Sequence, residues 1–479
     1  MRMNGPQGFL SFLVCVLSCA LPCLLPVGVL AQESPPPCPK PPDYKYLRFD
    51  EDYSYLRNPG CRTDFFDNAK FISLKPAGKW YISLGAETRQ TTEYFINSAW
   101  GRPPQSPAYS LERYMAHADF HLGGRFRFFV QVKSGLEFNR VPGPRVFDRD
   151  EFDIENGFFD FGLLRAPSYS LTLRAGRQEL AFGATRWVSA REGPTVRQTF
   201  DGFRLLLTAG AWRFDAFATK PVKTNTGVLD DAPDPTKSFW GAYTVRPFAV
   251  LPGGNIDLYY FGLDQKLVTY NQGAAPERRH TIGTRLWGKH NAWDYDEEAL
   301  FQFGTFGSGD IRAWALETDT GFTLGSLPAT PRIELKADIS SGDKNLSNPN
   351  LQTFNPLFPR GIYDQLVNLV GHVNFIDALP VVTFHPVKSL SFAPECEFIW
   401  RESLQDGVYG VGGNLIRPVL NNSRARYVGT QPTLTTIWQA NRHFSVVGIY
   451  THFLPGPFIR QTGVAQNVDY FSGWIDFKF

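Results

Sequence analysis

The feature that most constrains this chain is an alternation of apolar and polar residues with a period of two, which recurs across residues 79–479. Near its start, Phe126 and Phe128 alternate with Arg127 and Gln131. Successive side chains of a β-strand point to opposite faces, so each such segment predicts a strand with one apolar and one polar face. Strands of this kind occur both in soluble sandwiches and in membrane barrels.

The connectors distinguish these two architectures, because long and short ones alternate between about eighteen strand-like segments. The long connectors that we expect are residues 97–110, 140–152, 179–198, 221–235, 265–278, 341–369, 404–430 and 454–467, with 304–310 intermediate. The short ones are 123–124, 165–167, 209–211, 247–254, 289–292, 325–331, 385–389 and 441–443. This pattern predicts an all-β fold, a transmembrane up-and-down antiparallel barrel of outer-membrane type, with both chain ends on the side of the short turns.

Composition agrees with many strands and excludes several classes of protein. Gly (43) and Pro (36) are abundant, Phe is very frequent (41) and Met is rare (3). A net charge of +2 argues against a nucleic-acid-binding protein, and the aromatic content argues against disorder. The sequence has neither a His-Glu-x-x-His nor a Gly-x-Ser-x-Gly motif. We therefore expect no enzyme activity, no cofactor and no metal site; Asp343, Asn345 and Ser347 alternate like calcium ligands, but no glutamate closes the loop.

The N-terminus has the layout of a secretory signal peptide. One positive charge, at Arg2, precedes an almost wholly apolar run that ends in small residues at Ala31. We expect residues 1–31 to be removed and residues 79–479 to form the barrel in the outer membrane of a Gram-negative cell; an N-terminal membrane anchor is the alternative. The terminal Phe479 on an alternating strand is typical of a signal for the barrel-assembly machinery.

Residues 32–78 lie outside the strand pattern and are expected to form a periplasmic N-terminal extension. They are rich in Pro, charge and aromatics, which suggests a lid or a contact with a periplasmic partner; a loosely ordered tail is the alternative. The segment is too short for a folded plug. Cys38 and Cys61 could form a disulfide in an oxidising compartment or remain free thiols, and Cys396 has no obvious partner.

Several motifs make the chain resemble the alginate-export family of outer-membrane barrels. The most specific run is Arg174–Gly183, and the others are residues 46–52, 186–187, 200–202, 341–343 and 354–359. The resemblance implies an 18-stranded barrel, with lipid around it, that conducts an anionic polysaccharide or a related small acidic solute.

If the apolar faces contact lipid, the polar faces line a water-filled channel. The basic residues that we expect to line it are Arg89, Arg113, Arg127, Lys133, Arg174, Arg177, Arg186, Arg191, Arg285, Arg312, Arg332, Lys336 and Arg401. Arginine binds carboxylates through a planar fork, so such a wall would concentrate anions. Acidic residues share the same faces, however, and the alternative is that arginines and carboxylates only neutralise each other across neighbouring strands.

The best candidate for a constriction is the stretch 174–202, which contains five arginines. We expect this long connector to fold into the lumen and set the anion preference; a loop that only covers the mouth is the alternative. Arg177 has the parity of the lipid-facing residues, so we expect a bulge at Gly176 to turn it inward, unless it lies above the bilayer.

The function that the sequence predicts is passive conduction of an acidic polysaccharide or acidic solute. A general porin, or one specific for carboxylates or sugars, is a second possibility. An adhesin or receptor that uses loops 341–369 and 404–430, or an envelope-modifying enzyme, would belong to other classes.

Overall fold

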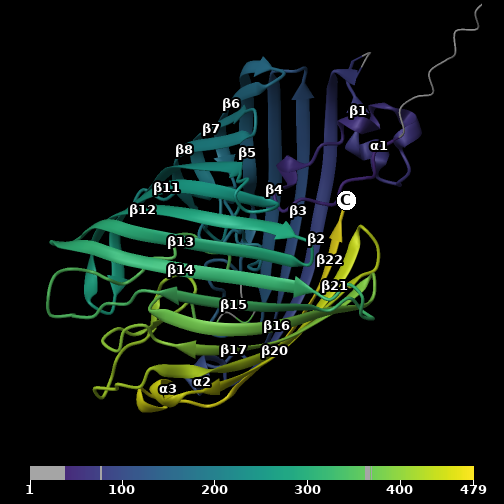
Figure 1. The fold of residues 1–479 in the computed structure, drawn as a ribbon. Helices are drawn as coiled ribbons and strands as arrows, with labels where there is room; N and C mark the ends of the chain where they lie inside the picture. The colour runs from purple at the N-terminus through teal and green to yellow at the C-terminus, as the bar shows by residue number, and fades with distance from the viewer. Residues whose placement is uncertain (1–37, 76–77, 362–366, 368) are drawn as a thin grey trace, which may run out of the picture. The chain divides into compact units, whose positions relative to one another are not determined.

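The computed structural model describes residues 38–75, 78–361, 367 and 369–479. The chain divides into two units, residues 1–39 and 40–479, and the second contains every regular element. Its main sheet has 20 strands. β1 (Ile72–Ser73) pairs only with β2, and β9 (Ala232–Pro233) only with β8. The remaining eighteen strands form a closed antiparallel ring (Figure 1).

The ring strands follow one another in chain order, each pairing with the next. They are β2 (Trp80–Ile96), β3 (Ala108–Leu122), β4 (Phe126–Phe138), β5 (Asp150–Ala166), β6 (Tyr169–Gln178), β7 (Phe200–Ala209), β8 (Trp212–Lys223), β10 (Lys237–Pro247), β11 (Gly254–Tyr270), β12 (Gly273–His290), β13 (Trp293–Phe306), β14 (Gly309–Thr323), β15 (Arg332–Ser340), β16 (Phe375–Val387), β17 (Leu390–Trp400), β20 (Tyr427–Gln439), β21 (Phe444–Pro455) and β22 (Val468–Lys478).

The ring closes where the first long strand meets the last. β2 pairs with β3 and also with β22, with Glu87 opposite Lys478. The backbone of Phe479 then exchanges hydrogen bonds of 2.9 and 3.0 Å with that of Ala86. Closure pairs the edges that an open sheet would leave exposed, as a bilayer requires. The predicted barrel fold is confirmed.

The strand directions place the start of β2 and the end of β22 toward one rim, which we call the short-turn rim; the opposite one is the long-loop rim. One expected long connector, 265–278, and one expected intermediate connector, 304–310, are wrong. Residues 265–278 and 304–310 are mostly strand, because β11, β12, β13 and β14 extend outward and are joined by the two-residue turns 271–272 and 307–308. The register of β11 and β12 shifts between Gln265 and Val268, and the regular alternation of apolar and polar residues is lost there, which is why these strand ends resemble a loop in the sequence.

The two faces of the barrel differ in character around the ring. Outward-facing Phe126, Phe159 and Phe203 are exposed, as a lipid-facing surface requires. The inner face, however, is not uniformly polar. On β8, β10 and β11 it carries Phe217, Phe239, Tyr243, Tyr259 and Phe261, which are all buried. The expectation that one parity meets lipid and the other meets water is therefore wrong for this part of the wall.

The remaining elements are short. The 3₁₀ turns are η1 (Arg48–Asp50), η2 (Ser54–Arg57) and η3 (Pro59–Cys61); the helices are α1 (Asp67–Lys70), α2 (Ser98–Gly101) and α3 (Pro457–Gln461); β18 (Val408–Tyr409) pairs with β19 (Leu415–Arg417). Within the described ranges, none of these helices has the length and apolar character needed to cross a bilayer.

The N-terminal extension contacts the inner wall of the barrel. Phe49 packs edge-on against Phe129 and Phe158, with ring centroids 5.8 and 5.2 Å apart. The backbone carbonyl of Phe49 accepts a hydrogen bond of 2.6 Å from Arg127. Residues around η1 therefore occupy part of the lumen near the short-turn rim, where the sequence analysis expected a lid or a partner contact. The signal peptide lies outside the described residues.

Three cysteines, Cys38, Cys61 and Cys396, are among the described residues. Cys61 is buried, and Cys396 is a free thiol on β17. Cys38 belongs to the N-terminal unit and Cys61 to the barrel unit, and the bond between them stays a prediction.

Candidate functional site in the lumen

The connector of residues 179–199, between β6 and β7, folds into the lumen and is held there by ion pairs. Its Glu192 carboxylate contacts Arg89 and Arg113 of the wall at 2.8 Å and Arg197 of the same connector at 2.9 Å. Burial alone would raise the pKa of Glu192, but these arginines hold it well below its ordinary value. Glu192 is therefore a fixed anion that fastens the connector to β2 and β3.

The same connector is also fastened to the far side of the ring. Arg186 contacts Asp296 at 2.9 Å and Glu298 at 3.2 Å, both on β13. Because β2 and β13 are far apart in the ring order, residues 179–199 bridge the lumen. The predicted inward fold of this connector is thus present in the structure.

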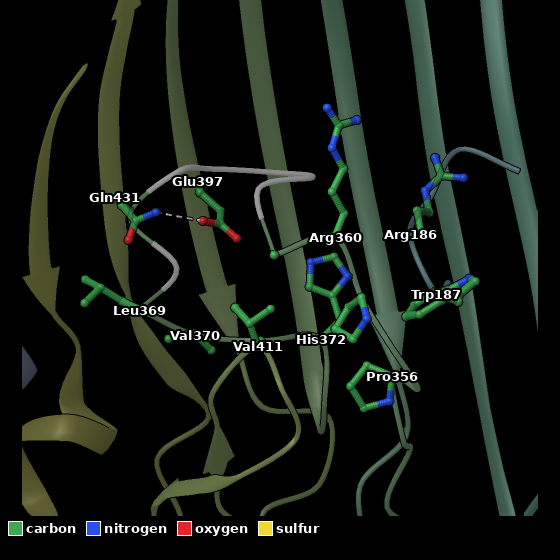
Figure 2. Close-up of a pocket in the computed structure, with 13 residues that line it drawn as sticks. Arg186, Trp187, Pro356, Arg360, Leu369, Val370, His372, Glu397, Val411 and Gln431 are labelled. Atoms are coloured by element: carbon green, nitrogen blue, oxygen red, sulfur yellow. Dashed lines mark hydrogen bonds between the residues drawn. The ribbon is translucent and has the colours of Figure 1, made fainter. Parts of the chain in front are cut away.

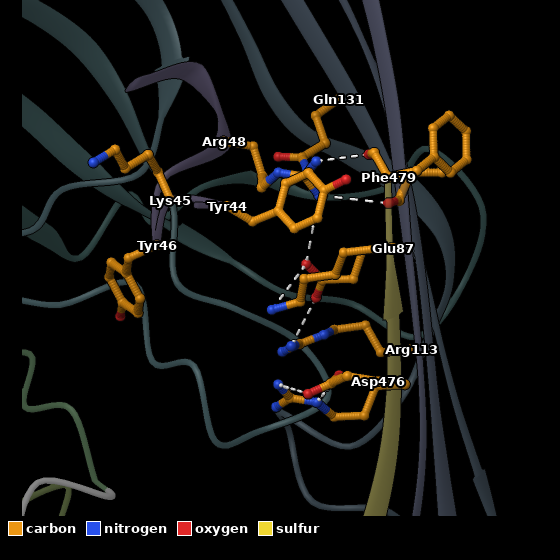
Figure 3. Close-up of polar contacts among 12 residues, drawn as sticks. Tyr44, Lys45, Tyr46, Arg48, Glu87, Arg113, Gln131, Asp476 and Phe479 are labelled. Carbon is orange, nitrogen blue, oxygen red and sulfur yellow. Dashed lines mark hydrogen bonds and ion pairs between the residues drawn. The ribbon is translucent and has the colours of Figure 1, made fainter. Parts of the chain in front are cut away.

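Most of the predicted lining cations are matched by carboxylates of nearby strands or connectors. Arg89 contacts Asp476, Arg113 contacts Glu87, Arg127 contacts Asp119, Arg174 contacts Asp160, Arg285 contacts Asp257 and Asp296, Arg332 contacts Asp294, and Lys133 contacts Asp150, Glu155 and Asp231. Figure 3 shows Arg48, Glu87, Arg113 and Asp476 stacked along β2 and β22. Lys336 has the inward parity of Arg332 on β15. The alternative of mutual neutralisation describes these residues well.

Three of the predicted lining residues are not in the lumen wall. Arg312 has the outward parity of β14, and its side chain is 70% exposed. Arg401 is buried and donates to backbone carbonyls, including that of Asp406 at 2.8 Å. On β14 the inner parity instead holds residues such as Ile311 and Ala313, which are covered by the connector 341–374.

The third is Arg177, for which the expected bulge is wrong. The register of β6 runs through Gly176 without a shift on the β7 side, so that Arg177 lies opposite Asp201. The two form an ion pair of 2.9 Å next to the end of β6, at the long-loop rim. The other placement considered, above the bilayer, stays a prediction; there, an ion-pair partner would reduce the cost of the charge.

The described part of a second connector, residues 341–374 between β15 and β16, also lies in the lumen. Leu351 pairs with Ile311 of β14, and Phe358 pairs with Val188 of the first connector. Phe358 packs on Phe200 and Phe239, with ring centroids 4.9 and 4.8 Å apart. The two connectors thus cover the aromatic inner wall and give the lumen a hydrophobic core.

Three cavities among the described residues adjoin one another at arginines. The first, of about 1110 Å³, and the second, of about 1310 Å³, share Phe147, Arg191 and Gly412. A third, of about 540 Å³, shares Arg360 and Leu369 with the second. Figure 2 shows Arg360 beside His372 and Arg186 around this third cavity.

Arg191 and Arg360 differ from the wall arginines in their surroundings. Among the described residues, neither guanidinium forms an ion pair or a hydrogen bond, and Arg360 only faces the ring of Tyr46, 5.8 Å from its centroid. Burial lowers the pKa of Arg191 to about 10, so it stays charged at neutral pH. Its φ of 57° lies in the left-handed region, a conformation that costs about 1–3 kcal/mol and is often found at functional positions.

Sequence reasoning named Arg191 but missed Arg360. Arg360 follows the motif of residues 354–359, which was used only as a mark of the family. The aromatic inner wall was also missed, although the apolar residues of both parities around 239–243 and 259–263 were a usable signal.

The comparisons with known proteins agree with this architecture. The family model described as "Alginate export" matches residues 80–471. The fold is similar to that of Acinetobacter baumannii OccAB1 (TM-score 0.57, 11% identity, covering 86% of this chain and 99% of that one) and Pseudomonas aeruginosa OccD3 (OpdP) (TM-score 0.55, 11% identity, covering 92% and 99%). At this identity the likeness concerns the fold alone. No curated protein matches the chain in sequence.

The family match covers most of the chain, including all but the last residues of the barrel, and the fold is a closed antiparallel barrel. The chain therefore belongs to the alginate export family of outer-membrane β-barrel channels.

Proposed function

We propose that this channel is passive and prefers anions, and that it carries an acidic polysaccharide such as alginate or a related acidic saccharide. The short-turn rim would face the periplasm and the long-loop rim the exterior, as is usual for such barrels. Phe479 would serve in recognition by the barrel-assembly machinery.

The observation that carries this proposal is the position of Arg191 and Arg360 where the cavities adjoin, with no carboxylate partner among the described residues. A guanidinium without a partner can bind a passing carboxylate through two parallel hydrogen bonds. Solvated ion pairs contribute only about 0–1 kcal/mol, which is weak enough for the solute to leave again. The paired arginines of the wall lack this free capacity.

The test is the reversal potential of the mature protein in planar bilayers under a salt gradient. Arg191→Gln and Arg360→Gln should each reduce the preference for chloride over potassium, and the double variant should reduce it further. Arg312→Gln is the matched control, because it removes the same charge outside the lumen. A double variant with wild-type selectivity would contradict the proposal.

A porin for single carboxylates is the second candidate. The observation that favours it is that two inward connectors divide the lumen into separate cavities, which suits small solutes better than a polymer. Current block by uronate oligomers of increasing length separates the two. Block that strengthens with length favours the polymer; equal block by monomer and oligomer favours the small solute. Neutral sugars of matched size should block neither.

A further inference from the structure

A cluster of potential metal ligands lies in the lumen wall, apart from the arginines of the proposed function. Glu317 of β14 is directly opposite Asp338 of β15. His372, near the end of the connector 341–374, faces both: its Nδ1 lies 3.3 Å from Glu317 Oε2 and 3.8 Å from Asp338 Oδ2. One ligand atom from each of the three lies within 4.8 Å of the other two.

The electrostatics of Glu317 call for a cation. Its side chain is 0% exposed, and neither carboxylate oxygen has a hydrogen-bond partner. Among the described residues, no Lys or Arg lies within ion-pair distance of it; the only basic group in reach is His372. A buried carboxylate without a hydrogen bond is strongly unfavourable.

Its neighbour in the adjacent strand has a different environment. Glu298 is opposite Glu317 and accepts hydrogen bonds from Arg186 and Tyr259. Glu317 is thus a buried anion between two other acidic residues of the same cross-strand row, Glu298 and Asp338.

The geometry points to a divalent transition-metal site, and we propose that Glu317, Asp338 and His372 bind Zn²⁺. Zinc takes imidazole nitrogen and carboxylate oxygen at about 2.0–2.2 Å in a tetrahedral arrangement, which sets neighbouring ligand atoms about 3.3–3.6 Å apart. The distances of 3.3 and 3.8 Å from His372 are close to this spacing. The imidazole favours zinc over calcium or magnesium, which prefer oxygen ligands alone.

The ion would fix the connector to the wall. His372 stacks on Phe375, with ring centroids 4.6 Å apart, and lies edge-on to Trp187 of the first connector at 6.3 Å. Through these contacts, metal bound at β14 and β15 would hold both inward connectors in place. His372 and Arg360 line the same cavity. Zinc binding would therefore make that cavity more rigid, but it would not supply its anion preference.

The experiment uses the untagged mature protein in detergent, treated with chelator and then dialysed. Isothermal titration with Zn²⁺ should give one site per barrel. Glu317→Gln and His372→Ala should each weaken it at least tenfold, whereas the control His452→Ala should not, because His452 faces a single carboxylate, Asp469. Unchanged affinity in Glu317→Gln and His372→Ala, or no stoichiometric Zn²⁺ binding by the wild type, would overturn the proposal.

A second measurement needs no variant. X-ray absorption of the zinc-loaded wild type should give one imidazole nitrogen and otherwise oxygen ligands. A spectrum with two or more imidazoles, or with only oxygen ligands, would place the ion elsewhere and refute the assignment. Neither result depends on anion selectivity, so failure here is distinguishable from failure of the proposed function.

Discussion

Lys133 offers the sharpest test of the idea that the paired cations of the wall stabilise the barrel. Its ammonium lies 3.0 Å from Asp150, 3.3 Å from Glu155 and 2.9 Å from Asp231. The side chain of Lys133 is 4% exposed and those of the three carboxylates are 0% exposed. One lysine therefore holds the start of β5 and the connector after β8 against β4.

We expect Lys133→Met to destabilise the barrel by about 3–5 kcal/mol at pH 7, the usual cost of removing one partner from a buried ion pair. A second estimate of the lost unfolding free energy comes from the cost of protonating a carboxylate. Neutralising one orphaned carboxyl group of ordinary pKa near 4 costs about 1.4 kcal/mol per pH unit, or about 4 kcal/mol at pH 7. The loss of unfolding free energy in Lys133→Met should become smaller as the pH falls towards about 4, because the carboxyl groups then become protonated in the unfolded chain as well.

The assay is urea unfolding of the refolded protein in detergent micelles, followed by the fluorescence of its 11 tryptophans. Lys266→Met is the control, since Lys266 is an exposed residue of β11. A loss below about 1 kcal/mol in Lys133→Met, or a loss that does not change with pH, would refute the reasoning. Among variants that still insert, the reversal potential should equal that of the wild type.

Three further predictions concern the extension and the chain end. Non-reducing mass spectrometry of the mature protein should find a peptide that joins Cys38 to Cys61, and two separately alkylated cysteines would contradict the pairing. Burial lowers the pKa of Lys70 to about 7. Above this pH the unfolded chain binds more protons than the folded one. The unfolding free energy of the wild type relative to Lys70→Met should therefore rise by up to about 1.4 kcal/mol per pH unit between about pH 7 and 10. A difference in unfolding free energy that does not change with pH in urea titrations would refute this. Deleting Phe479 should reduce the amount of heat-modifiable barrel in outer membranes, as measured by gel shift, and equal amounts would argue against its role in assembly.

The sequence was sufficient for the strand number, the order of the strands and the position of the chain ends, because alternation and connector parity are local properties. It was insufficient for the lumen. Whether Arg113 binds Glu87 or is free to bind a solute depends on the strand register. It also depends on where the connector between β6 and β7 places Glu192. Arg177 shows the same limit, since its partner Asp201 lies on the next strand across a long insertion.

The position of Arg191 in the lumen could be predicted from the sequence, because several arginines lie close together in one long connector. Among the described residues Arg191 forms no ion pair, whereas Arg186 does. This difference could not be predicted from the sequence, because it depends on which arginines the wall carboxylates reach. Arg360 is a single arginine in a Pro-rich stretch, and no local pattern marks it.

The hydrophobic core inside the ring means that any path for a solute through the barrel must run off the central axis. The second cavity is bordered by β2, β3 and β22, and the first by the ends of β8, β10 and β11 at the long-loop rim, whereas the aromatic residues deeper on β8 to β11 are covered by the two connectors. A solute that crosses the barrel would therefore meet β8, β10 and β11 only near the long-loop rim, and would otherwise follow β2, β3 and β22. Substitutions that change what passes should gather among the residues that border these two cavities, and the covered aromatic residues are free to evolve under the demands of packing alone.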